Sequence, residues 1–469
     1  MAGVGIPVSF LVLEGSPPGA PPSLVPITLI ILVVAVSRLA TIIYTGDLRI
    51  VSIVSWMMIY ISGAVVPLAQ AHASLWPVTI NIEFLPEAQL MILAWAIAFE
   101  VGQHLRSRER RVFDVTQAKP ISLSRLKSLT IIASIITLAY IAKLGPASFF
   151  QSRADLAIAM NDSGIRGGGS QVTSAFFSMG ATVPVFICLV TWIVITYKKP
   201  EKRSAGMKLL KLWLLALNVI VNNPISSSRF WALTIFIGFA FAMPWFKART
   251  MRFIIPAGII TALVLFPYSD YFRGQEGQIQ VVGVVEKIST KDYDQSTMTA
   301  NGIWYGERYG HTHGRQILGA VLFAVPRTLW PGKPLDTGVM VGQAASEQIY
   351  VGTTNLSSPA WVEAWIDFGM PGVIIIGAAV GWLARRADEM FMAARASGRV
   401  TVIAVSLPMF AGFSFILLRG PLLQSMGRVA GMALVAWWLA DRKLMSKGDP
   451  AVDGEAKESS DAALTGVSR

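Results

Sequence analysis

Long apolar runs recur along the chain, and most are long enough to cross a lipid bilayer. A spanning helix needs about 20 mostly apolar residues, because the hydrocarbon core is about 30 Å thick. Hydrophobic residues make up 53% of the 469 residues, and charged residues make up only 14%, against roughly 25% in an ordinary soluble protein. These features exclude a disordered chain and a typical soluble enzyme. They predict a single all-α, polytopic membrane domain.

Eleven of the apolar runs are predicted to be spans, so we expect about 11 transmembrane helices, with a range of 10–12. The runs lie near 25–43, 51–71, 84–103, 128–143, 172–196, 209–221, 230–246, 253–267, 370–384, 400–418 and 429–440. A further run, 317–326, has only ten residues. At about 1.5 Å rise per residue it is too short to cross as a helix, so we expect it to lie at the interface or to re-enter the membrane.

Lysine and arginine are distributed unevenly between the two sets of alternating loops. The loops 44–50, 104–127, 197–211, 247–252, 385–399 and 441–469 together hold 26 Lys and Arg in 96 residues. The other set holds 12 in 184 residues. The positive-inside rule therefore predicts that the first set is cytoplasmic, with the N-terminus outside and the C-terminus inside.

The predicted spans divide the chain into five parts. These are an extracytoplasmic segment 1–24, spans 1–8 within 25–267, a large extracytoplasmic loop 268–369, spans 9–11 within 370–440, and a disordered cytoplasmic tail 441–469. Residues 1–13 lack a basic region, so we expect no cleaved signal peptide. A loop of about 100 residues is usually functional rather than a simple connection, so we expect the site in or beside 268–369.

Arginine dominates the basic residues of the predicted outer face, where it accounts for nine of twelve. Four of these arginines lie at the membrane boundary, namely Arg229, Arg273, Arg327 and Arg419. The planar guanidinium binds phosphate through two parallel hydrogen bonds, and the boundary is where a lipid-linked phosphate would lie. The alternative for any one of them is contact with lipid headgroups or pairing with a nearby carboxylate.

Candidate bases lie in the same outer region. His311 and His313 stand two residues apart, and histidine suits proton abstraction near neutral pH. The alternative is a pair of exposed loop residues. The two histidines have no third ligand at a characteristic spacing, so no metal site is expected. Glu363 and Asp367 are four residues apart and would share a helix face, where they could raise a pKa or instead form a salt bridge with Arg327 or Arg419.

Several classes of chemistry leave no trace in the sequence. The chain has no P-loop, no G-x-S-x-G, no H-E-x-x-H and no C-x-x-C motif. Its one cysteine, Cys188, excludes an intrachain disulfide. The net charge of +12 is accounted for by the cytoplasmic loops, so no nucleic acid partner is expected. We expect no cofactor, and an activated substrate has to supply the energy of any reaction.

Two segments carry a resemblance to a known family. AVPRTLWPGKPLDTG (324–338) and SSPAWVEAWIDFGMPGV (357–373) resemble the Wzy-type polymerases of oligosaccharide repeat units, which make bacterial O-antigen and exopolysaccharide. SSSRFW (226–231) and SDYFRGQ (269–275) also look like positions of that family. The resemblance implies a metal-independent glycosyltransferase in the bacterial cytoplasmic membrane. Such an enzyme transfers a growing glycan from polyprenyl diphosphate to a new lipid-linked repeat unit at the outer face.

The resemblance and the residue chemistry together give a set of expected site residues. The expected diphosphate contacts are Arg229, Arg273, Arg327 and Lys333. The base is expected among His311, His313 and Glu363. Trp330 and Trp361 are candidates for stacking on sugars, and the alternative for them is the aromatic belt of a membrane protein. The expected partners are polyprenyl-diphosphate-linked oligosaccharide, membrane lipids, a flippase and a chain-length regulator.

Two other functions fit parts of the same sequence. A ligase similar to the O-antigen ligases would transfer a finished glycan to another acceptor, and the sequence does not identify the acceptor. A transporter or flippase of lipid-linked oligosaccharide would place charges at mid-membrane on broken helices, often in repeated halves. The concentration of charge at one face and the unequal loops favour an enzyme over a transporter.

Overall fold

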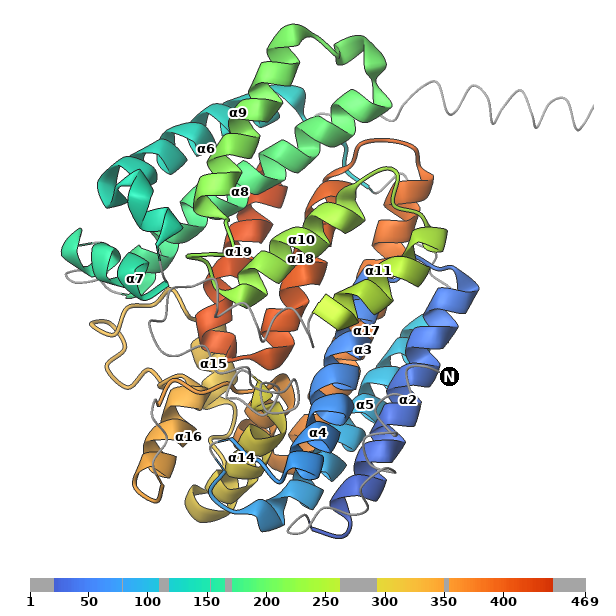
Figure 1. Ribbon diagram of the computed structural model, residues 1–469, viewed down its shortest axis with the longest axis vertical. Helices are drawn as coiled ribbons and strands as arrows, with labels where there is room; N and C mark the ends of the chain where they lie inside the picture. Colours follow the sequence, from blue (N-terminus) through green and yellow to red (C-terminus); the bar gives the residue numbers. More distant parts are fainter. Residues whose placement is uncertain are drawn as a thin grey trace, which may run out of the picture.

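The computed structural model describes residues 21–77, 79–108, 118–151, 153–164, 171–261, 293–349 and 354–441. Within these ranges the chain is helical, and the only β pairing consists of two isolated bridges (Figure 1). The predicted all-α class is therefore confirmed. The predicted tail 441–469 lies outside the described residues except for Asp441.

The described helices fall into two groups along the chain. The first group comprises α2 (Leu24–Thr45), α3 (Ile50–Tyr60), the π-helical turn η1 (Ile61–Val65), α4 (Val66–Ala73), α5 (Leu85–Arg108), α6 (Leu123–Leu144), α7 (Arg153–Asp162), α8 (Gln171–Lys198), α9 (Ala205–Val221), α10 (Arg229–Ala242) and α11 (Ala248–Ile260). The second group comprises α14 (Gln295–Tyr309), α15 (Arg315–Val321), α16 (Thr337–Ser346), α17 (Ala360–Ala396), α18 (Val402–Arg419) and α19 (Leu422–Leu439).

Seven helical stretches are long and apolar enough to cross a membrane. They are Leu24–Thr45, Ile50–Ala73, Ile82–Ser107, Leu123–Leu144, Phe177–Lys198, Ala360–Ala396 and Val402–Arg419. A polytopic membrane protein is thus supported, whereas the predicted count of about 11 is not confirmed. The other four predicted spans coincide with α9, α10, α11 and α19. The first three of these have 17, 14 and 13 residues, and α19 is less apolar than the seven.

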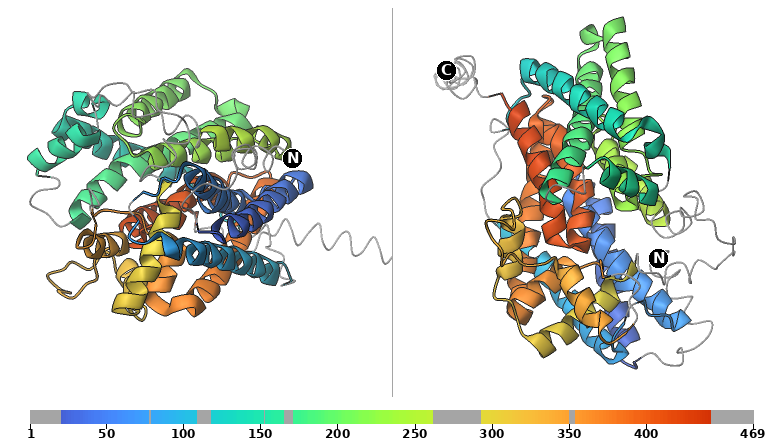
Figure 2. Two further views of the ribbon diagram at one scale, coloured as in Figure 1. Left: turned by 60° about the horizontal axis from the view of Figure 1, so that its bottom comes forward. Right: turned by 90° about the vertical axis from the view of Figure 1, so that its left-hand side faces the viewer.

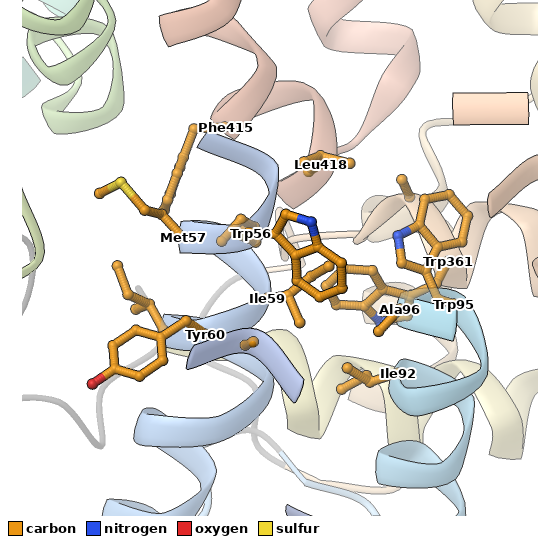
Figure 3. Packing of buried hydrophobic residues seen from close by; sticks show 14 of the residues in the cluster. Trp56, Met57, Ile59, Tyr60, Ile92, Trp95, Ala96, Trp361, Phe415 and Leu418 are labelled. Carbon is orange, nitrogen blue, oxygen red and sulfur yellow. The ribbon is translucent and has the colours of Figure 1, made fainter. Parts of the chain in front are cut away.

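The helices form two hydrophobic clusters that share α10 and α18. One cluster joins α2–α5 to α17, and the other joins α6, α8 and α9 to α19. Figure 1 shows α6, α8 and α9 grouped above, and α2–α5 with α17 below, with α10 and α18 between them. In the first cluster Trp56, Trp95 and Trp361 are fully buried, and the rings of Trp95 and Trp361 meet edge to face at 6.1 Å (Figure 3). The shared helices hold the two groups together.

Three helices of the predicted large loop gather at one end of the bundle. Helices α14, α15 and α16 lie together at the bottom of Figure 1, near the ends of α4 and α5, and the two views of Figure 2 agree with this grouping. The run 317–326 falls on α15, whose seven residues are too few to cross the bilayer. The charge distribution predicts that this end faces outward, and we call it the outer end.

Helix α14 is buried although its sequence is polar. Every residue from Gln295 to Ile303 is buried, and the segment includes two threonines, a serine and an asparagine. It packs against α5 and α17 rather than lying in solvent. Its hydroxyl groups find local partners, since Thr299 donates to the carbonyl of Gln295 at 2.7 Å. Part of the predicted outer loop is therefore a component of the protein core.

Glycines let α5 and α17 approach until their backbones touch. Gly377 and Gly381 are four residues apart on α17, which is the small-xxx-small spacing of close helix pairs in membranes. A Cβ atom at Gly381 would lie 1.9 Å from the carbonyl oxygen of Phe99, and one at Gly102 would lie 1.9 Å from that of Ala378. No side chain larger than hydrogen fits at either position.

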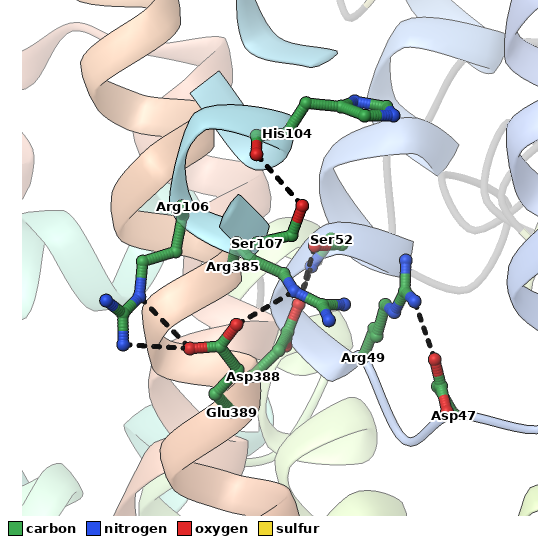
Figure 4. Close-up of polar contacts among 9 residues, drawn as sticks. All are labelled: Asp47, Arg49, Ser52, His104, Arg106, Ser107, Arg385, Asp388 and Glu389. Carbon is green, nitrogen blue, oxygen red and sulfur yellow. Dashed lines mark hydrogen bonds and ion pairs between the residues drawn. The ribbon is translucent and has the colours of Figure 1, made fainter. Parts of the chain in front are cut away.

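Polar contacts join α3, α5 and α17 at the opposite end of the bundle (Figure 4). The Asp388 carboxylate is fully buried and accepts hydrogen bonds from the backbone N–H groups of Val51 and Ser52, at 2.8 and 3.1 Å, and from the Ser52 hydroxyl. It therefore caps α3 from another helix, which satisfies N–H groups that α3 itself cannot pair. Beside it, Glu389 pairs with Arg106 and Arg385 at 3.0 and 3.1 Å.

Replacing Gly381 by leucine tests the α5–α17 contact. The new side chain meets backbone, so the helices have to separate, and overpacking of this kind typically costs about 1–3 kcal/mol. We expect a lower melting temperature for the purified protein in detergent, followed by tryptophan fluorescence. The control is Gly206→Ala in α9, where a Cβ meets nothing closer than 4.0 Å. Equal melting temperatures for Gly381→Leu and the control would show that the contact is not needed.

Candidate functional site

Charged and polar side chains are buried together at the outer end, where α14–α16 meet the spans. Asp294 is 1% exposed and Glu363 is 3% exposed. Burial of a charge is costly unless the charge is paired or hydrogen-bonded, so the partners of these groups define the site. The contacts fall into one group around Asp294 and another around Glu363.

The first group is a buried ion pair between two distant segments. Asp294, which immediately precedes α14, lies 3.7 Å from the guanidinium of Arg419 at the end of α18. Its carboxylate also accepts a hydrogen bond from the hydroxyl of Ser357 at 2.6 Å. The Arg419 guanidinium stacks on the ring of Phe230, with its carbon 4.5 Å from the ring centroid. The Asp294 group therefore links α14, α18, α10 and the segment before α17.

Three arginines gather around the first turn of α10. Arg229 is the first residue of that helix, Arg419 lies over Phe230, and Arg428 of α19 lies over Trp231 at 4.8 Å. We call Arg229, Arg419 and Arg428 the arginine cluster. The turn is capped by a serine hydroxyl that accepts from the N–H of Trp231 at 3.3 Å. A helix N-terminus carries partial positive charge, so helix and side chains together favour an anion here.

The second group surrounds Glu363 in the first turn of α17. One carboxylate oxygen accepts from the hydroxyl of Thr337 at 2.6 Å, and the other accepts from the backbone N–H of Leu422 at 3.2 Å. Thr337 begins α16 and Leu422 begins α19. Glu363 therefore fixes the starts of two helices. The salt bridge with Arg327 or Arg419 that the sequence allowed is replaced by these two hydrogen bonds.

Asp336 is a second buried carboxyl group beside Glu363. It caps α16 by accepting from the N–H of Gly338 at 3.1 Å. Burial raises the pKa of Asp336 to about 6, and hydrogen bonds from Gln424 and from the backbone N–H groups of Val339 and Gly338 oppose that rise. The carboxyl is therefore close to half protonated in weakly acidic solution, unlike an exposed aspartate.

Asp367 lies one turn after Glu363 but serves a different segment. Its carboxylate accepts from the Thr312 hydroxyl and from the N–H groups of Gln316 and Ile317, at 3.0 and 2.9 Å. These N–H groups belong to the first turn of α15, so Asp367 holds that helix against α17. Glu363 and Asp367 were predicted to share one helix face. They do not form a joint site, because each carboxylate binds the starts of different helices.

The two histidines lie in the loop between α14 and α15. Both side chains are exposed. The His311 ring meets Trp365 edge to face, with centroids 5.3 Å apart, and a Cβ at Gly369 would lie 3.0 Å from its Nε2 atom. His313 has a left-handed backbone, with φ of 51°, and its N–H donates to the carbonyl of Asp367 at 2.9 Å. The loop therefore presents both imidazoles at the surface above the start of α17.

Arg327 and Lys333 brace the loop in which they lie. The Arg327 guanidinium donates to the carbonyls of Lys333 and Pro334 at 2.6 and 2.9 Å. The Lys333 ammonium donates to the carbonyls of Phe323 and Val325 at 2.6 and 3.0 Å, and burial lowers its pKa. These hydrogen bonds give both residues a structural role in the PRTLWPGKP segment. Hydrogen bonds from these two cations to backbone carbonyls therefore hold the conformation of the segment.

The remaining predicted contacts are placed differently from one another. Trp330 lies in the same loop and is partly exposed. Trp361 is fully buried, and its indole N–H donates to the hydroxyl of Thr299 at 2.8 Å. No ring face of Trp361 is open to a sugar, so its role is in the core, and the sugar-stacking assignment for it does not stand. Arg273 lies outside the described residues.

No family model, curated protein or solved structure matches this chain. The resemblance to repeat-unit polymerases therefore rests on the quoted sequence segments. In the ranges that the structure describes, no three His, Cys, Asp or Glu side chains form a group able to hold a metal ion.

Sequence reasoning identified the outer charges but missed which of them meet. The sequence predicted no role for Asp294 or Arg428. The sequence offers one signal for the burial of Asp294. The run DQSTMTANG (294–302), which begins at this residue, is polar yet contains small residues and a single charge. A run of that composition suits a helix packed inside protein at membrane depth better than a solvated loop.

Asp336→Asn tests the buried carboxyl through the pH dependence of stability. Burial raises the pKa of Asp336 in the folded protein to about 6, above its value in the unfolded chain. The stability that the protonated carboxyl supplies is therefore lost as the pH rises through about 6. Asparagine keeps the cap of α16 but has no charge. We expect the variant to melt above the wild type at pH 8 and at the same temperature at pH 4. A constant difference at both pH values would mean that the charge of Asp336 is irrelevant.

Proposed function

We propose that the chain is a membrane glycosyltransferase that polymerises polyprenyl-diphosphate-linked oligosaccharide repeat units. The reaction takes place at the outer face of a bacterial cytoplasmic membrane, and its product is O-antigen, capsule or exopolysaccharide. The main support is the arginine cluster, in which Arg229 begins α10 and the guanidinium groups of Arg419 and Arg428 lie over the rings of Phe230 and Trp231. A diphosphate attached to a polyprenyl chain is held at the membrane boundary, and arginine is the side chain that matches its geometry.

The arginine cluster suits the charge that develops during transfer. A hydroxyl of the acceptor sugar attacks the anomeric carbon of the donor glycan. The bond between that carbon and the diphosphate oxygen breaks, and its electron pair leaves with the diphosphate. Fixed cations near the leaving group stabilise the additional negative charge without having to reorganise. Arg229 keeps its expected role as a diphosphate contact, and Arg419 and Arg428 join it.

The acceptor hydroxyl loses a proton, which a base has to accept. Both oxygens of Glu363 already accept hydrogen bonds that hold α16 and α19, so we assign Glu363 a positioning role. His311 has an exposed ring held edge-on by Trp365. An exposed, oriented imidazole can reach a sugar hydroxyl and accept its proton near neutral pH. We therefore place His311 ahead of Glu363 and His313 as the base.

Substitutions in the arginine cluster test the diphosphate role. A host lacking the gene is complemented with Arg229→Gln or Arg428→Gln, and its polysaccharide is displayed as a ladder on a gel. Loss of one transition-state contact typically lowers a rate by about 10²–10³, so we expect single repeat units in place of long chains. The matched control is Arg308→Gln, because Arg308 is exposed on α14 beside Trp304 and Tyr309.

The same ladder separates the possible functions. In the host lacking the gene, a collapse to single repeat units supports a polymerase. Long chains that remain on the carrier lipid indicate a ligase, and loss of all polysaccharide with repeats trapped on the inner face indicates a flippase. Full-length chains from both arginine variants, at wild-type membrane levels, would contradict the diphosphate role of the cluster.

His311→Ala tests the assignment of the base. General base catalysis typically contributes about 10²–10⁴ to a rate, so we expect the variant to yield single repeat units while its level in the membrane is unchanged. His313→Ala is the matched control, because its imidazole is equally exposed two residues away. A wild-type ladder from His311→Ala, or the same loss from both variants, would remove His311 from the base role.

A further inference from the structure

A groove lies on the side of the bundle between α2 and α5. Its volume is about 540 Å³, and its walls include Val34, Ile97 and Val101 together with Arg38, Glu100 and His104. Both helices belong to the stretches able to cross a membrane. Ile97 and Val101 are 53% and 48% exposed, so the groove opens toward the surroundings of the bundle. For a membrane-spanning pair of helices those surroundings are lipid.

Three ionisable side chains meet within this apolar groove. One oxygen of Glu100 lies 3.2 Å from the Arg38 guanidinium and 3.0 Å from Nδ1 of His104. No residue in the described part of the chain bonds the second Glu100 oxygen, and Arg38 forms one ion pair through one of its nitrogens. With neutral histidine, the group carries one positive and one negative charge side by side, and each still has hydrogen-bonding capacity.

The position of these charges is costly for a purely structural pair. Arg38 lies seven residues before the end of α2 at Thr45, which is about 10 Å of helix. Ionisable groups are disfavoured within a membrane-spanning stretch, and an ion pair removed from water typically adds little stability over apolar contacts. A ligand that offers both a negative and a positive group would compensate each charge. The charge distribution places this depth near the cytoplasmic end of α2.

We propose that the groove binds a phospholipid with an ethanolamine headgroup. The lipid phosphate accepts hydrogen bonds from Arg38, and the lipid ammonium donates to the second oxygen of Glu100. An acyl chain lies along Val34, Ile97 and Val101. The paired charges select this headgroup, because a glycerol headgroup has no cation for Glu100 and a choline headgroup has no N–H to donate.

Lipid binding to the full-length protein in detergent micelles tests this site. Native mass spectrometry measures the bound fraction on titration with dioleoyl phosphatidylethanolamine, phosphatidylcholine and phosphatidylglycerol. We expect about tenfold tighter binding of the ethanolamine lipid, equivalent to about 1.4 kcal/mol. Glu100→Gln should abolish its advantage over the choline lipid, and Arg38→Gln should weaken all three. The control is Arg49→Gln, which removes the ion pair with Asp47 in the connection between α2 and α3.

A second measurement does not depend on any variant. The amine of the ethanolamine lipid is methylated once, twice and three times, and binding of each lipid to the wild type is compared. We expect binding to fall most at the third methylation, which removes the last N–H. Equal binding of the three headgroups, an unchanged preference in Glu100→Gln, or displacement of the ethanolamine lipid by an equimolar polyprenyl phosphate would overturn the proposal.

Discussion

Close contact between the backbones of α5 and α17 determines the position of both ends of the bundle. Gly102 on one helix and Gly381 on the other leave no room for a side chain, so the pair is fixed in register. At the end opposite to α14–α16, this register brings Glu389 to Arg106 and places Asp388 under the first turn of α3. At the outer end the first turns of α17 lie against α14. Glu363 and Asp367 of the candidate site are therefore carried by a helix whose position against α5 is fixed.

The start of α17 organises the starts of α15, α16 and α19. Glu363 binds the first residues of α16 and α19, and Asp367 binds the first turn of α15. The first N–H groups of a helix have no partners inside that helix. A carboxylate that accepts their hydrogen bonds offsets the free-energy cost of burying both the carboxylate and the N–H groups. Gly369, with φ of 65°, breaks the helical path just after these carboxylates. The outer turns of α17 thus serve as an anchor for the predicted loop.

The outer end combines this rigid scaffold with charge suited to an anionic substrate. The arginine cluster comes from three helices. Arg419 pairs with Asp294 and stacks on Phe230, and Arg428 stacks on Trp231. The exposed His311 lies above the same end of α17. The proposed polymerase needs fixed cations for a diphosphate and an accessible base for a hydroxyl, and the arginine cluster and His311 are the groups proposed for these two roles. The lipid groove between α2 and α5 is independent of that chemistry.

The sequence by itself determined where the long apolar helices form, because an apolar run in a bilayer has to satisfy its own backbone hydrogen bonds. It did not predict α14 and α16, which lie within the predicted loop. It predicted that the site lies in or beside the large loop, and it identified the run 317–326, which falls on α15, as too short to cross. Only the tertiary structure decided which side chains meet. Arg229 is far from Arg419 and Arg428 in the chain, and helix packing brings the latter two to the first turn of α10. The same packing buries Trp361, whereas Arg327 is directed to backbone carbonyls by the conformation of its own loop. Hydropathy depends on each residue's own chemistry. Which side chains come into contact depends on the rotation and register of neighbouring helices, and a single sequence does not specify these.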